Sequence, residues 1–147
     1  MTITEATIFF NELLKNSDSR REIKVYKEFI TILTNLKSRD FTEVQLVLIE
    51  DTIAKMNLES NPGKKRRYFS KQLSEFKKFL KTNFSLITEG YYATLGMSLG
   101  MCFGLAIGTS LEGAGNTTGL LLGMIIGYAF GRKKDKEAME DNNVLKN

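Results

Sequence analysis

The charged side chains of this sequence are 21 lysines and arginines against 17 aspartates and glutamates, and the other residue types that commonly catalyse reactions or bind metals are scarce. The chain has no histidine and a single cysteine, Cys102. This composition excludes a His/Cys metal site, a Cys-His or Ser-His nucleophile pair, and a disulfide within one chain. We therefore expect a protein that is not an enzyme and that needs no cofactor or metal.

Lysine and arginine are concentrated in two short segments. Residues 64–81 carry eight basic residues against one acidic residue, a net charge of +7, whereas residues 1–60 carry eight basic and ten acidic residues. The second cluster begins at residue 132. Cations gathered in this way suit phosphate groups, either of lipid headgroups or of nucleic acid. The residues expected at a membrane surface are Lys64, Lys65, Arg66, Arg67, Lys71, Lys77, Lys78, Lys81, Arg132, Lys133 and Lys134.

Both clusters flank a long, almost uncharged segment, and this position favours the lipid interpretation. Between Gly90 and Gly131 the one charged residue is Glu112. An apolar run of about 18 residues or more is long enough to cross a bilayer as a helix. Two such runs, separated by the turn-like residues 112–116, predict a transmembrane helical hairpin.

Glycines recur every four residues in both predicted membrane helices. Glycine inside a soluble helix costs roughly 1 kcal/mol relative to alanine, whereas in a bilayer small residues let two backbones approach closely. When the two runs are folded antiparallel, Gly108 faces Gly119 and Gly96 faces Gly131. We expect the hairpin to pack through glycine zippers at Gly96, Gly100, Gly104, Gly108, Gly119, Gly123, Gly127 and Gly131.

The first predicted membrane helix carries a second row of small residues, about 200° around from its glycines. This row is Thr94, Ser98, Cys102, Ala106 and Ser110. The second helix carries large residues away from its glycines. The asymmetry predicts that the first helix lies inside a homo-oligomer or lines a pore, while the second faces lipid. Alternatively, the hydroxyls of this row are satisfied by carbonyls of their own helix.

Residues 1–60 show the apolar spacing of amphipathic helices. Helices are predicted over 3–16 and 20–37, and Thr42 with Gln45 matches a capping box for a third helix that runs to about Leu58. The core positions expected on this third helix are Val44, Val47, Leu48, Ile53 and Met56. The N-terminus lacks the basic segment of a secretory signal peptide, so residues 1–89 are expected to stay on the side of synthesis.

Residues 64–84 predict a basic amphipathic helix. Its apolar face is Phe69, Leu73, Phe76, Leu80 and Phe84. Beside a membrane segment, such a helix is expected to lie on the headgroups, where each cation near an anionic surface contributes roughly 1 kcal/mol. A solvated face and nucleic-acid binding are the alternatives, and packing into the N-terminal domain also stays open.

The predicted fold is all-α, with an N-terminal helical domain of three to four helices followed by the transmembrane hairpin. We divide the chain into a cytoplasmic helical domain (1–60), a basic juxtamembrane helix (61–89), the glycine-zipper hairpin (90–131), and a tail that is first basic and then disordered (132–147). Because Lys and Arg beside a membrane helix mark the cytoplasmic side, both termini are expected in the cytoplasm.

The GxxxGxxxGxxxG spacing of both runs resembles small bacterial glycine-zipper membrane proteins, over residues 90–131 alone. The resemblance implies close helix packing, most simply in a bacterial inner membrane, and no particular activity. Rotor-ring subunits of ATP synthases are less similar, because they need a mid-membrane carboxylate that Gly119 to Gly131 lacks. Glycine-zipper lipoproteins of the outer membrane have a signal and a lipidated cysteine, and this sequence shows neither.

Three functions are consistent with these features. The favoured one is a homo-oligomeric membrane anchor or scaffold, whose helical domain docks an unidentified cytoplasmic protein. The first alternative is a small pore-forming or membrane-perturbing effector. The second is a soluble helical module that binds nucleic acid. The expected partners are the lipid bilayer, further copies of the chain and a cytoplasmic protein, with nucleic acid the least favoured.

Overall fold

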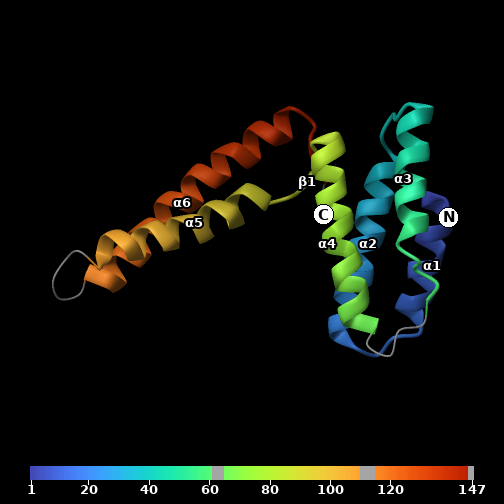
Figure 1. Cartoon of the computed structure of the whole chain (residues 1–147), viewed down its shortest axis with the longest axis horizontal. Helices are drawn as coiled ribbons and strands as arrows, with labels where there is room; N and C mark the ends of the chain where they lie inside the picture. Colours follow the sequence, from blue (N-terminus) through green and yellow to red (C-terminus); the bar gives the residue numbers. More distant parts are fainter. Residues whose placement is uncertain (61–64, 110–114, 146–147) are drawn as a thin grey trace. The chain divides into compact units, whose positions relative to one another are not determined.

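The structure, a computed structural model, describes residues 1–60, 65–109 and 115–145. The predicted all-α class is confirmed, since these residues form six helices and one two-stranded ladder (Figure 1). The chain divides into two compact units: unit 1 holds Met1–Leu86 and the C-terminal end from Leu145, and unit 2 holds Ile87–Val144. The elements are α1 (Ile3–Lys15), α2 (Arg20–Lys37), α3 (Glu43–Lys55), α4 (Lys65–Phe84), β1 (Ile87–Thr88), α5 (Tyr91–Gly108), α6 (Gly115–Glu140) and β2 (Val144–Leu145).

Two helices of unit 1 begin with capping boxes. The box predicted from Thr42 and Gln45 is present at the start of α3, where the Thr42 hydroxyl accepts from the Gln45 backbone N–H. A second box begins α1, where the Thr2 hydroxyl accepts from the Glu5 backbone N–H at 3.1 Å. Each box satisfies two backbone donors that a helix start leaves without an intrahelical partner.

Unit 1 has a core of aromatic side chains. Helix α2 packs against both α1 and α4, while α3 packs against α1 (Figure 1). The rings of Phe10 on α1 and Phe29 on α2 stack with centroids 4.2 Å apart, and Phe69 on α4 meets Phe10 edge to face. Aromatic pairs of this kind contribute roughly 0.5–1.5 kcal/mol beyond the area that they bury.

The apolar face of α4 is part of this core. Phe69, Leu73, Phe76 and Leu80 are buried among α1 and α2, and Phe84 is half-buried. The structure therefore settles the packing question that the sequence leaves open, because α4 packs within unit 1. Its apolar face is already covered by protein and is not free to enter lipid headgroups.

Three of the five core positions predicted on α3 are wrong. Val44, Val47 and Leu48 are 78%, 66% and 42% exposed, whereas Ile53 and Met56 are buried as predicted. The buried face also includes Ile49. The physical reason is that α3 carries apolar residues on two sides, and Ile49, Ile53 and Met56 share one face at i, i+4, i+7 spacing. Apolar spacing alone does not decide which side meets α1.

In unit 2, α5 and α6 lie antiparallel and side by side along their length (Figure 1). Helix α6 continues past Gly131 to Glu140, and a left-handed Asn142 then turns the chain into β2. Strand β2 pairs with β1, and the Ile87 N–H donates to the Asn143 carbonyl at 3.0 Å. The disorder predicted in the later part of the 132–147 tail is therefore wrong up to Leu145, because this stretch forms the end of α6 and the strand β2.

Candidate functional site

The two glycine rows meet in the contact between α5 and α6. A Cβ atom added to Gly100 would lie 2.0 Å from the carbonyl oxygen of Gly123 and 3.1 Å from the Cα of Gly127. Both obstacles are backbone atoms, so any side chain at this position pushes the helices apart. The structure brings together Gly96, Gly100, Gly104 and Gly108 of α5 with Gly119, Gly123, Gly127 and Gly131 of α6.

Each glycine in the middle of the contact lies against two residues of the other helix that are one turn apart. A Cβ on Gly104 would lie 3.1 Å from the Cα of Gly123, and a Cβ on Gly123 would lie 2.8 Å from the Cα of Gly104. The nearest carbonyl oxygen to Gly104 belongs instead to Gly119. In the middle of the contact, Cα neighbours therefore follow the register expected from the sequence, while the closest carbonyl is offset by one helical turn.

A buried carboxylate joins the first turn of α5 to α6. Asp135, 7% exposed, accepts the backbone N–H of Tyr92 at 2.9 Å and that of Ala93 at 2.8 Å. The N-cap of α5 is Gly90, which has no side chain to accept these donors and adopts a φ of 73°. Asp135 thus caps α5 from another helix and places a negative charge at its positive end.

Asp135 is not among the site residues that the sequence predicts. In the sequence it stands among cations, between Lys134 and Lys136, and reads as part of a basic tail. A signal was nevertheless available, because Asp135 follows Gly131 by four residues and so continues the α6 glycine row by one turn. A carboxylate in the row that faces α5 has to meet a donor there, and the free amides of the α5 N-terminus supply it.

The outer surface of the α5–α6 pair is apolar. Large side chains point outward from both helices, with Phe103 67% and Phe130 72% exposed. Monomeric soluble proteins rarely expose large continuous apolar patches. The exposed large residues are Leu95, Leu99, Phe103, Leu105, Ile107, Leu121, Leu122, Ile125, Ile126, Tyr128, Phe130 and, near the end of α6, Met139.

By length and composition, α5 is the one helix within the described ranges that is apolar enough to span a membrane. The first turn of helix α6 contains three polar residues, 116–118, and the helix continues into the cations from Arg132. The second predicted span therefore carries polar groups at both of its ends. Residues 110–114, which hold the predicted tip up to Ala114, lie outside the described residues.

One side of the α5–α6 pair is hollowed into an apolar groove of about 550 Å³. Its floor is formed by the glycine backbones, and among the described residues Thr118 is the one polar lining residue. The rim is Leu99, Phe103, Ile107, Leu122, Ile126 and Phe130. On the opposite side of the pair, Met97, Met101, Leu120 and Met124 are half-buried against the contact.

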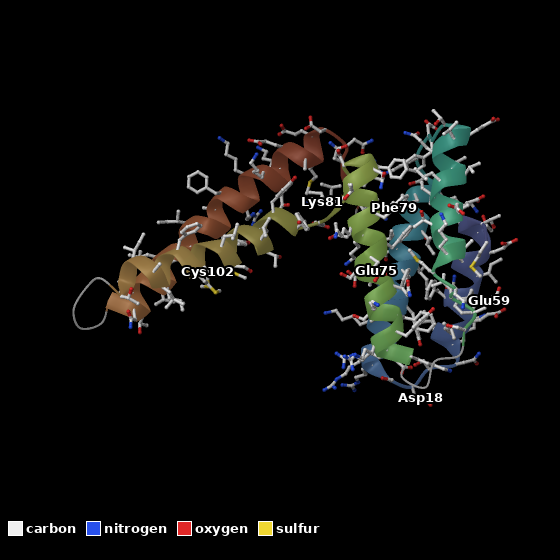
Figure 2. The ribbon with its side chains drawn as sticks, in the orientation of Figure 1. Asp18, Glu59, Glu75, Phe79, Lys81 and Cys102 are labelled. Carbon is white, nitrogen blue, oxygen red and sulfur yellow. The ribbon has the colours of Figure 1, made fainter. Side chains whose placement is uncertain are left out.

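The small-residue row of α5 lies on the surface of unit 2. Thr94, Ser98, Cys102 and Ala106 are exposed, and Cys102 points away from α6 (Figure 2). The Thr94 hydroxyl donates to the Gly90 carbonyl at 3.0 Å, and the Ser98 hydroxyl donates to the Thr94 carbonyl at 2.9 Å. These two hydroxyls are thus satisfied within their own helix. Ser110 lies outside the described residues.

The predicted surface cations differ in their surroundings. Lys77 is half-buried and forms an ion pair with Glu28 across α4 and α2, so it is held within unit 1. Lys71 lies 3.7 Å from Glu75, and the Arg132 guanidinium lies 5.9 Å above the Tyr128 ring. Lys64 lies outside the described residues. The exposed members of the set are Lys65, Arg66, Arg67, Lys71, Lys78, Lys81, Arg132, Lys133 and Lys134.

No family model matches the chain, and no curated protein or solved structure matches it either. Within the described part of the chain, no group of three or more His, Cys, Asp or Glu side chains is placed to hold a metal ion. Unit 2 therefore presents an apolar surface around the glycine contact, and cations follow Gly131 on α6.

Proposed function

We propose that the protein is an integral membrane protein that serves as a homo-oligomeric anchor or scaffold, with the α5–α6 pair crossing the bilayer as a hairpin. The observation that carries the proposal is the inverted packing of unit 2. Glycine backbones form the contact, while leucine, isoleucine and phenylalanine side chains point outward. Such a surface is costly in water and favourable in hydrocarbon.

The dimensions of α5 support a membrane span. Its 18 residues extend about 27 Å, close to the hydrocarbon thickness of about 30 Å. Tyr91 and Tyr92 lie at the start of α5, and Tyr128 and Arg132 lie where α6 passes it. Tyrosine and cations at one end are typical of a membrane interface on the cytoplasmic side. We therefore propose a bacterial inner membrane, with both termini in the cytoplasm.

Helix α4 supports membrane association through charge alone. Its apolar face is buried in unit 1, whereas Lys65, Arg66, Arg67 and Lys78 are exposed. Each cation near an anionic surface contributes roughly 1 kcal/mol without inserting into it. The same cations are the basis of the alternative that the protein binds nucleic acid. The apolar surface of unit 2 does not support this alternative.

The small-residue row of α5 is the surface proposed for contact between copies. Small side chains let two helices approach closely in a bilayer, and Cys102 lies in this row and is exposed. Oxidation in membranes is expected to give a disulfide-linked dimer, because a disulfide needs Cα atoms within about 7 Å. The measurement is non-reducing gel electrophoresis of membranes treated with a mild oxidant.

A matched control moves the thiol to the other helix. The double variant Cys102→Ser, Leu121→Cys carries one exposed cysteine on α6, and its dimer band is expected to be several-fold weaker. Equal bands from both chains would contradict a specific contact through the small-residue row.

The pore alternative is favoured by one observation, the exposed hydroxyl and thiol groups along α5. Two of these hydroxyls already donate to their own helix, and no charge in the row favours a particular ion. Dye leakage from liposomes separates the two functions. Leakage that rises with protein density would support a pore, and sealed liposomes at every density support the anchor.

A further inference from the structure

We propose that the apolar groove on the α5–α6 pair binds one acyl chain of an anionic phospholipid, whose phosphate is held by Lys134. The inference depends on the proposed membrane insertion and adds a specific ligand to it. Its basis is the shape of the groove, its apolar lining, and the cation that continues its rim.

The groove suits an acyl chain better than a helix of a second copy. Its floor is glycine backbone, but the rim residues Phe103, Ile107 and Phe130 project beside it and are largely exposed. Helices that pack closely in membranes meet through small residues, and this rim would hold a second helix away from the floor. A single acyl chain is narrow and flexible enough to lie between the two rims.

The length of the groove fits one leaflet. From Thr118 to Phe130 it runs for about 18 Å at 1.5 Å per residue, slightly more than half of the hydrocarbon thickness of about 30 Å. A chain that enters at the Phe130 end therefore reaches the bilayer midplane without leaving the groove. At the far end of the groove the described lining includes the polar residue Thr118.

On the opposite side of the pair, methionine side chains cover the middle of the glycine contact. Met97 and Met101 on α5 and Met124 on α6 are half-buried there. Methionine has three rotatable bonds and fills irregular gaps. The sequence thus fills one side of the glycine contact with flexible side chains and leaves the other open between branched and aromatic rims.

Lys134 is the reason to expect an anionic headgroup. It follows Phe130 by four residues, so it lies on the same face of α6 one turn beyond the groove, and it is exposed. Arg132 and Lys136 lie around the helix from this face, and the Arg132 guanidinium is placed above the Tyr128 ring. Lys133 lines a separate hollow together with Arg132 and Lys136. Lys134, which continues the row of Ile126 and Phe130 at four-residue spacing, is therefore the α6 cation that we expect to meet the phosphate of a lipid whose chain occupies the groove.

The test uses the full chain reconstituted in vesicles of equal parts phosphatidylglycerol and phosphatidylcholine. The vesicles are floated, the protein is extracted in mild detergent, and native mass spectrometry counts the lipids that it retains. One cation at an anionic headgroup corresponds to a preference of about fivefold. The chain is expected to retain phosphatidylglycerol over phosphatidylcholine by about this factor.

Two pairs of variants locate the site. Lys134→Gln is expected to remove the fivefold preference, whereas Lys136→Gln, with the same loss of charge, keeps it. Ile126→Trp fills the groove and is expected to lower retention of both lipids. Ile125→Trp, on the outer face of α6, is expected to leave retention unchanged.

The outcomes separate this inference from the proposed function. Equal retention of the two lipids, or equal effects of the two lysine variants, would overturn the groove proposal. Lipid-free dimers that Ile126→Trp disrupts would also overturn it, because a second copy of the chain would then occupy the groove. A chain that does not float with the vesicles would overturn membrane insertion itself, and the groove proposal with it.

Discussion

Replacing Gly104 by leucine is expected to separate α5 from α6 and to destabilise their contact by about 3 kcal/mol or more. A Cβ atom at this position would lie 2.1 Å from the Gly119 carbonyl oxygen and 3.1 Å from the Cα of Gly123. Because both are backbone atoms, no rotamer change relieves the overlap. The helices have to move apart, and the neighbouring glycine contacts are lost with them.

Amide hydrogen exchange of the purified chain in detergent micelles measures this effect. Peptides from α5 and α6 are expected to exchange at least about 100-fold faster in Gly104→Leu, the factor that corresponds to about 3 kcal/mol. The control is Ala129→Leu, which adds a large side chain to an exposed position of α6. Its protection is expected to change by less than about 0.5 kcal/mol, and unchanged protection in Gly104→Leu would disprove the glycine contact.

Replacing Asp135 by alanine is expected to destabilise the start of α5 by about 2–4 kcal/mol. The substitution leaves the backbone N–H groups of Tyr92 and Ala93 without their acceptor, and Ala93 is buried. A hydrogen bond to a charged group contributes about 1.5–3 kcal/mol, and a buried donor without a partner costs about 1–3 kcal/mol. The favourable charge at the helix N-terminus is lost as well.

The measurement is again hydrogen exchange, read at the first turn of α5. Asp135→Asn keeps an acceptor oxygen but loses the charge, so its effect is expected to be intermediate. Glu137→Ala removes a carboxylate two residues away on the exposed side of α6 and is expected to leave the α5 amides protected. If Glu137→Ala and Asp135→Ala had equal effects, net charge rather than capping would explain the result.

Helix positions and the glycine contact are the parts that the sequence predicts best. Helix α2 spans Arg20–Lys37, as apolar spacing predicts, and α3 begins at the capping box. These features depend on neighbours three or four residues apart, which the helix places on one face whatever the rest of the chain does. The glycine rows depend on the same periodicity.

The remaining features depend on contacts between residues far apart in the sequence. Lys77 reads as a surface cation until α2 brings Glu28 beside it. Val44 and Val47 read as core residues, because apolar spacing does not say which of two faces meets α1. The capping role of Asp135 requires both the antiparallel register and a helix that continues past Gly131, whereas local composition there predicts a disordered tail.

Membrane flotation tests the central claim most directly, namely that the apolar surface of the α5–α6 pair lies in hydrocarbon. Membranes from cells that make the full chain are washed at alkaline pH and floated through a density gradient. The account predicts that the chain stays with the floated membranes and leaves them only when detergent is added. Recovery of the chain in the detergent-free supernatant after high-speed centrifugation would contradict it.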